Sequence, residues 1–160
     1  MSTHVDPALR SLIVLATLGV ETPVTLHVPG AAVSGRLISA RRYHELAAEF
    51  TERTAKGVPP DFLEMLMRRY TEEAQELREL EERNSAHSRR EAEELVSEAD
   101  QDEIDRIDEA LYGYAHLTDA RLILDLASLP RTSGGVETLG LWRGDARRVG
   151  GFMLGTPARG

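Results

Sequence analysis

The chain of 160 residues contains no cysteine. Disulfide bonds and thiolate metal sites are therefore excluded, and the composition is compatible with the cytosol. Long apolar runs are also lacking, because the longest one near the N-terminus, Leu12 to Val20, is about half as long as a membrane span. No basic segment and small-residue cleavage site frame it as a signal peptide. We therefore expect a soluble, cytoplasmic protein without a membrane partner.

Signatures of catalysis and of phosphate binding are missing as well. The glycines form no Gly-x-Gly-x-x-Gly, no Walker-type Gly-Lys-Ser/Thr and no Gly-x-Ser-x-Gly. The five histidines lack the i,i+3 or i,i+4 spacing of metal ligands. His27 and His116 could be neighbours across a sheet, but a site of two histidines needs carboxylate help. We expect no enzyme activity, no cofactor and no metal.

Negative charge is abundant and unevenly distributed. The net charge is −8, but the stretch from Asp61 to Tyr112 has 18 acidic and 7 basic residues, a net of −11 against +3 elsewhere. Carboxylates on exposed helices lack the desolvated pocket that acid-base catalysis needs. Such a surface repels nucleic acid, whose phosphates need several basic contacts. It suits solubility or a basic partner.

A β-hairpin is the clearest local pattern. Val24, Leu26 and Val28 alternate with polar residues, which predicts a half-buried strand. Pro29-Gly30 marks a tight turn, and a second strand is expected over Ala32–Ser39. Before the hairpin, a short helix is predicted with Asp6 as N-cap, Pro7 at the first helical position and Gly19 at C′. Its apolar residues lie mainly on one face: Leu9, Leu12, Ile13, Ala16 and Leu18.

The apolar period changes to about 3.6 after the hairpin. A helix of about three turns is expected around Tyr43–Phe50, ended by Lys56–Pro60. A longer helix starts at Asp61, and Asn84–Ser88 has the residues of a break. The two expected stripes are Phe62, Leu66, Tyr70, Ala74 and Leu77, and then Ala92, Leu95, Val96, Ala99, Ile104, Ile107 and Leu111. These helices predict an acidic α-helical hairpin that buries mostly itself, with Glu79 and Arg83 forming an i,i+4 pair.

Strand-like composition returns at the C-terminal end. We expect strands over Tyr112–Leu117 and Ala120–Leu126, separated by a turn or bulge at Thr118–Asp119. Arg131–Gly135 reads as a loop. A final hairpin is expected from Leu139–Asp145 and Val149–Leu154, with Gly144-Asp145 in its turn, and the tail from Gly155 is expected to fray.

The fold class that follows is α+β, with one small antiparallel sheet or partly open barrel, an N-terminal helix and a helical-hairpin insertion. We expect a single domain over residues 1–160. Residues 1–56 supply the first helix, the β-hairpin and a helix. Residues 57–111 form the acidic insertion, and residues 112–160 complete the sheet.

The run LWRGDARRVGGFMLG is the main candidate site. It joins the only tryptophan to several arginines and an apolar segment, and the residues of interest are Trp142, Arg143, Arg147, Arg148 and Phe152. Tryptophan and arginine are enriched in protein-binding hot spots and can also stack on nucleic acid bases. A core tryptophan with solvated arginines is the simplest alternative. The three interpretations, core, protein contact and nucleic acid contact, remain open.

Three segments together resemble the gas vesicle accessory protein U family (GvpU). They are TLHVPGAAVSGRLISARRYHELAAEF, YAHLTDARLI and WRGDARRVGGFMLG, about half of the chain. The resemblance implies a non-enzymatic accessory role in vesicle assembly or clustering. The partners it implies are the vesicle shell or other gas vesicle proteins, with a location in the cytoplasm at gas vesicles. The long acidic helical hairpin departs from the family pattern.

A separate analogy of element order is to Sm-like and SH3-like barrels, which begin with a helix, continue into a bent antiparallel sheet and often form rings. The alternative function is therefore an Sm-like RNA-binding ring protein, and the acidic block argues against it. Its candidate contacts are His27, Arg36, Arg143, Arg147 and Arg148. Leu63, Met65 and Met67 lie partly off the main helical stripe and could meet the barrel or another subunit. We predict a homo-oligomer.

Overall fold

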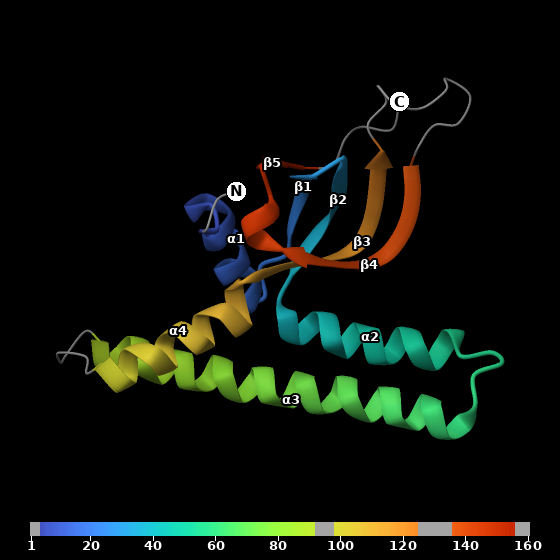
Figure 1. The fold of residues 1–160 in the computed structure, drawn as a ribbon, viewed down its shortest axis with the longest axis horizontal. Coiled ribbons are helices and arrows are strands. Elements are labelled where there is room, and N and C mark those ends of the chain that lie inside the picture. Colours follow the sequence, from blue (N-terminus) through green and yellow to red (C-terminus); the bar gives the residue numbers. More distant parts are fainter. Residues whose placement is uncertain (1–3, 92–97, 125–135, 156–160) are drawn as a thin grey trace. The chain divides into compact units, whose positions relative to one another are not determined.

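The computed structural model describes residues 4–91, 98–124 and 136–155 (Figure 1). In this part of the chain it is an α+β protein with four α-helices and an open antiparallel sheet of five strands. The elements in chain order are α1 (Pro7–Thr17), β1 (Thr22–Val28), β2 (Ala31–Ile38), α2 (Ala40–Thr54), α3 (Pro60–Glu91), α4 (Glu98–Tyr112), β3 (Tyr114–Leu124), β4 (Val136–Asp145), the 3-10 helix η1 (Ala146–Arg148) and β5 (Gly151–Leu154). They form two compact units, a sheet unit of residues 1–39 with 113–160 and a helical unit of residues 40–112.

The N-terminal helix begins and ends as its sequence predicts. Asp6 Oδ1 accepts hydrogen bonds from the backbone N–H groups of Ala8 at 2.8 Å and Leu9 at 3.1 Å. Gly19 has φ +86° and its N–H reaches the carbonyl of Ala16 at 3.0 Å, which ends the helix in a left-handed cap. Leu9, Ile13 and Ala16 form the buried face of α1, which packs against β2.

Leu18 does not belong to that buried face. It is the C-cap residue of α1 and is 74% exposed. Its backbone has left the helical conformation at this point, with ψ near 6°, so the helical period no longer determines where its side chain points.

The predicted β-hairpin is present as β1 and β2, with Gly30 at φ +77° in the turn. The expectation of a half-buried first strand was wrong at Thr25, which is only 2% exposed. β1 is an inner strand, paired with β2 on one side and β5 on the other. The Thr25 hydroxyl donates to the carbonyl of Gly155 at 3.0 Å, which satisfies the polar group that burial would otherwise leave unpaired.

β3 is one continuous strand with an irregularity in the middle, as the Thr118–Asp119 signal predicted. Asp119 has φ 51°, and the pairing with both neighbouring strands shifts register near this point. Gly35 of β2 lies against the bulge, where a Cβ would stand 2.8 Å from the Thr118 carbonyl oxygen. The bulge and the glycine therefore depend on each other.

The predicted C-terminal hairpin was wrong. The strand order is β4-β3-β2-β1-β5, so β4 pairs with β3 while β5 pairs with β1 at the other end of the sheet. Asp145 caps η1 by accepting from the backbone N–H of Arg147 at 2.9 Å, and the chain is thus directed away from a two-residue turn. Backbone hydrogen bonds from Gly150 to His27 and from Gly155 to Pro23 then hold β5 beside β1.

The break expected at Asn84–Ser88 was also wrong, because α3 continues to Glu91. Asn84 Nδ2 donates to the Tyr112 hydroxyl at 2.9 Å, and Ser85 Oγ donates to the carbonyl of Glu81 at 3.1 Å. Their side chains thus find partners without the backbone leaving the helix. The expected stripe residues at positions 92, 95 and 96 lie outside the described residues, as do the loop at 131–135 and the tail from 156.

The helical unit places α2 beside α3 and α3 beside α4. Its buried residues are Ala40, His44, Ala47, Ala74, Ile107, Leu111 and Tyr112. Phe50 and Phe62, both expected on the inner faces, are 54% and 49% exposed. Two helices in contact bury only a narrow stripe on each, so an aromatic residue at the stripe's edge remains in solvent.

Candidate interaction surfaces

Trp142 lies on β4, which forms one end of the strand order in the described sheet. It is half-buried, and its six-membered ring lies over Gly144, where a Cβ would collide with the ring. The glycine two residues along the same strand face therefore makes the space for the indole. This placement combines the core and surface interpretations, since part of the ring packs on the strand and part stays accessible.

Arg143 is exposed, and its guanidinium carbon lies 4.0 Å from the centroid of the Tyr114 ring. A cation over an aromatic face at this distance gains about 0.5–1 kcal/mol at an exposed site. Tyr114 opens β3, the strand paired with β4. The stacking orients Arg143 while leaving the edge of its guanidinium free to donate hydrogen bonds.

Arg147 and Asp145 form a closed local pair. Asp145 Oδ1 accepts from Arg147 Nε at 2.9 Å and Oδ2 accepts from Arg147 Nη2 at 3.1 Å. The hydrogen bonds with Arg147 hold the pKa of Asp145 below its ordinary value. Arg147 thus supports the 3-10 helix that follows β4, whereas Arg148 beside it is exposed and forms no ion pair with the described residues.

The Asp145–Arg147 pair predicts a pH-dependent effect. Because the pKa of Asp145 is lowered on folding, its stabilisation is fully present above about pH 4 and is lost as the pH falls through the folded-state value. Asp145→Asn should therefore lower the Tm at pH 7, and its difference from wild type should shrink at about pH 2.5. Thermal unfolding followed by circular dichroism measures this. A difference that stays constant between the two pH values contradicts the assignment.

Phe152 lies on β5, where it is half-buried and pairs with Leu26 of β1. The neighbouring Met153 and Leu154 are 54% and 70% exposed. The strand order thus separates Phe152 from Trp142, although only ten positions divide them in sequence. The five candidate residues occupy both edge strands of the described sheet and the turn that links these strands.

The two strand histidines are not neighbours. β2 lies between β1 and β3, so His27, exposed on β1, is paired with Ala32, while the buried His116 is paired with Ile38. The positions of His27 and His116 in the sequence could not reveal this. The two neighbours of β1 are β2 and β5, and neither of them carries His116. Within residues 4–91, 98–124 and 136–155, no three histidine or carboxylate side chains gather where they could hold a metal ion.

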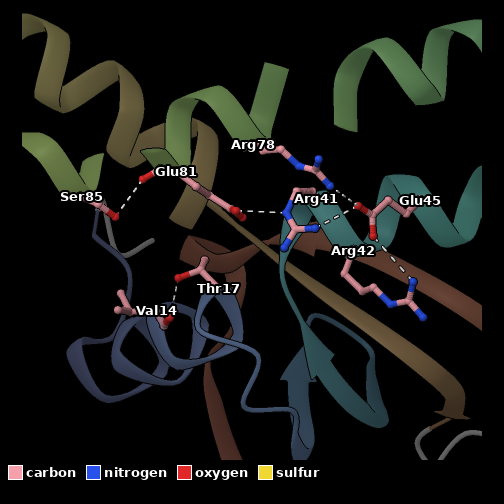
Figure 2. A network of polar contacts seen from close by, with 8 residues as sticks. All are labelled: Val14, Thr17, Arg41, Arg42, Glu45, Arg78, Glu81 and Ser85. Carbon is pink, nitrogen blue, oxygen red and sulfur yellow. Dashed lines mark hydrogen bonds and ion pairs between the residues drawn. The ribbon is translucent and has the colours of Figure 1, made fainter. Parts of the chain in front are cut away.

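A polar network in the helical unit links α2 to α3 (Figure 2). Arg41 donates to Glu81 Oε2 at 3.0 Å and to Glu45 Oε1 at 2.9 Å, and Glu45 also faces Arg42 at 3.6 Å and Arg78 at 3.9 Å. Burial alone lowers the pKa of Arg41, but the hydrogen bonds and charges of Glu81 and Glu45 outweigh it and raise the pKa above its ordinary value. Sequence spacing could have found Arg41 with Glu45 at i,i+4, but not Glu81.

The predicted Glu79–Arg83 pairing is replaced by other contacts. Arg83 Nη1 lies 4.0 Å from Glu103 Oε1 of α4, and Glu79 accepts from the side chain of Gln75 at 3.3 Å. Of the three off-stripe residues, Met65 is 55% exposed. Leu63 and Met67 are half-buried beside a shallow surface hollow along α3.

A groove of about 650 Å³ runs between α2 and α3. Its apolar surface includes Ala48 and Ala74, and its lining residues are Glu45, Ala48, Thr71, Glu72, Ala74, Gln75, Glu76 and Arg78. His44, which directly precedes the lining residue Glu45, is buried, with Nδ1 3.1 Å from Glu73 Oε2 and its ring against Tyr43 and Tyr70. This groove was not predicted, because it depends on which faces of two separate helices meet.

Comparison with known proteins gives one family. A family model described as gas vesicle protein GvpU-like matches residues 6–157, which is nearly the whole chain. No curated protein and no solved structure matches. Among the helices in the described ranges, none is both long enough and apolar enough to pass through a bilayer.

Proposed function

We propose, from the premise that this chain belongs to the GvpU-like family of gas vesicle proteins, that it is a non-enzymatic accessory protein affecting vesicle assembly or clustering. It acts in the cytoplasm at the gas vesicles. Its partners are the vesicle shell or other gas vesicle proteins, together with further copies of itself. The observation that carries this proposal is the family match over residues 6–157.

The sheet is best interpreted as a partly open barrel of the Sm-like or SH3-like kind. The support is the element order: a capped helix precedes β1, and the strand after η1 returns to lie beside β1. β2 and β3 pair although the whole helical unit separates them in sequence. This pairing supports the organisation of residues 1–160 as one domain, with the acidic helices of residues 57–111 inserted into it.

Self-association is proposed to use the sheet edges and the C-terminal strands. β4 and β5 end the strand order in the described residues, so each has an edge whose backbone groups can accept another chain. Next to these edges lie Trp142, Arg143, Arg148 and Phe152, with Met153 and Leu154 exposed. Aromatic residues and arginines are the usual energetic centres of protein interfaces. This arrangement supports the proposal that the protein forms a homo-oligomer.

The proposal is tested in vesicle-producing cells that lack this protein. Deletion is expected to change vesicle clustering, scored by electron microscopy, and expression of the wild-type chain should restore the original distribution. Clustering that is the same with and without the protein contradicts the proposed function.

A further inference from the structure

The groove between α2 and α3 has the character of a docking surface for a cationic segment. Ala48 and Ala74 give it apolar surface, and Glu72 and Glu76 lie one turn apart on α3 along its lining. Both glutamates are exposed, and neither forms an ion pair with the described residues. By contrast, Glu45 and Arg78, also in the lining, face each other at 3.9 Å.

The local excess of negative charge extends to the whole helical unit. Residues 40–112 contain 21 acidic and 11 basic residues, a net of −10, while the remainder of the chain has a net of +2. Two carboxylates at i,i+4 repel each other mildly, and a cation placed between them relieves the repulsion. A groove that combines apolar surface with unpaired carboxylates therefore fits a segment with both a cation and an apolar side chain.

The same chain carries such a segment on its sheet unit. Arg143 and Arg148 are exposed and form no ion pair with the described residues, and the half-buried Trp142 lies next to Arg143 in sequence. Asp145 is hydrogen-bonded to Arg147 and also attracts Arg148 electrostatically, so it offsets part of the positive charge. With three arginines and one aspartate, the segment keeps a net charge of +2. Residues 142–148 thus present two exposed guanidinium groups, those of Arg143 and Arg148, and part of an indole ring within seven positions.

We propose that the α2–α3 groove of one copy binds the segment 142–148 of a second copy. This inference rests on the proposed self-association and names the surfaces that meet. The contact is heterologous, because the groove and the segment are different patches of the same chain. Each added copy therefore leaves one groove and one segment free, and the assembly grows until it closes into a ring or remains an open chain.

Ionic strength distinguishes this contact from pairing of strand edges. Exposed charges attract each other weakly beyond the Debye length, which is about 3 Å at 1 M salt. The assembly should therefore dissociate in 1 M NaCl. Backbone hydrogen bonding between edge strands is much less sensitive to salt.

Complementary charge reversal in the full-length protein is the test. One variant reverses the groove with Glu72→Arg and Glu76→Arg, and the other reverses the segment with Arg143→Glu and Arg148→Glu. The control, Glu52→Arg with Glu82→Arg, makes the same charge change at exposed helical positions outside the groove. Circular dichroism verifies folding, and light scattering gives the mass against 17.7 kDa for one chain.

Each of the two variants, studied alone, is expected to bind further copies of itself roughly tenfold more weakly than the wild type or the control does. Mixing the two variants should restore association, because the intact groove of one meets the intact segment of the other and the two reversed surfaces also carry opposite charges. Assembly that persists in both variants, or a mixture that stays monomeric, overturns the groove assignment. A wild-type chain that stays monomeric at micromolar concentration also overturns the groove assignment. If vesicle clustering still depends on the protein in that case, the proposed accessory function is retained.

Discussion

Gly35→Ala is expected to destabilise the sheet by about 1–3 kcal/mol, because an added Cβ at this position meets backbone and not a flexible side chain. The Cβ would stand 2.8 Å from the Thr118 carbonyl oxygen and 3.2 Å from Ala120 Cα. Relief requires β2 and β3 to move apart at the bulge, which breaks the register on both sides of it. Urea unfolding followed by circular dichroism measures the change.

Gly151→Ala is the matched control for this substitution. Gly151 also lies in a strand, but a Cβ there meets no atom within 4 Å and its φ is not in the left-handed region. Its free energy of unfolding should stay within about 0.5 kcal/mol of wild type. If the two substitutions have equal effects, the close approach of β2 to the bulge is not what Gly35 provides.

Leu26→Ala should have the largest effect among single substitutions considered, about 2–5 kcal/mol. Leu26 is fully buried on β1 and is paired with Val33 of β2 and Phe152 of β5, so the cavity forms where three strands meet. Typical domains have only about 5–15 kcal/mol of stability, so the variant can lose a large share of it.

Leu154→Ala removes the same atoms from a side chain that is 70% exposed. It should change the free energy of unfolding by less than about 0.5 kcal/mol, because little apolar surface returns to water. The comparison, made by chemical denaturation at one temperature, isolates burial from side-chain identity. A Leu26→Ala effect as small as that of Leu154→Ala would contradict the position of β1 as an inner strand of the sheet.

Features that depend on neighbouring residues could be predicted from the sequence. The caps at Asp6 and Gly19, the turn at Gly30 and the irregularity at Asp119 each follow from a side chain's local preference, and the structure has all of them. The pairing of strands that are distant in sequence was harder to predict. The pattern of β5 predicts a strand but does not say which strand it joins, and its return to β1 is why Thr25 is buried instead of exposed.

In the helical unit, too, the sequence alone does not reveal contacts between distant residues. Asparagine is a frequent turn residue, yet α3 continues through Asn84, whose side chain donates to the hydroxyl of Tyr112, 28 positions away in sequence. The candidate site was predictable in composition, because Trp142 and its arginines stand together in sequence. Their different roles were not predictable, since Arg147 is held by Asp145 while Arg148 is exposed.

The proposed direct contact between this chain and gas vesicles is measured by co-flotation. Purified full-length protein is mixed with isolated vesicles, the vesicles are floated by low-speed centrifugation, and the protein is quantified in the buoyant and soluble fractions, with a vesicle-free mixture as the control. The protein should enter the buoyant layer only when vesicles are present. Protein left entirely in the soluble fraction would contradict it.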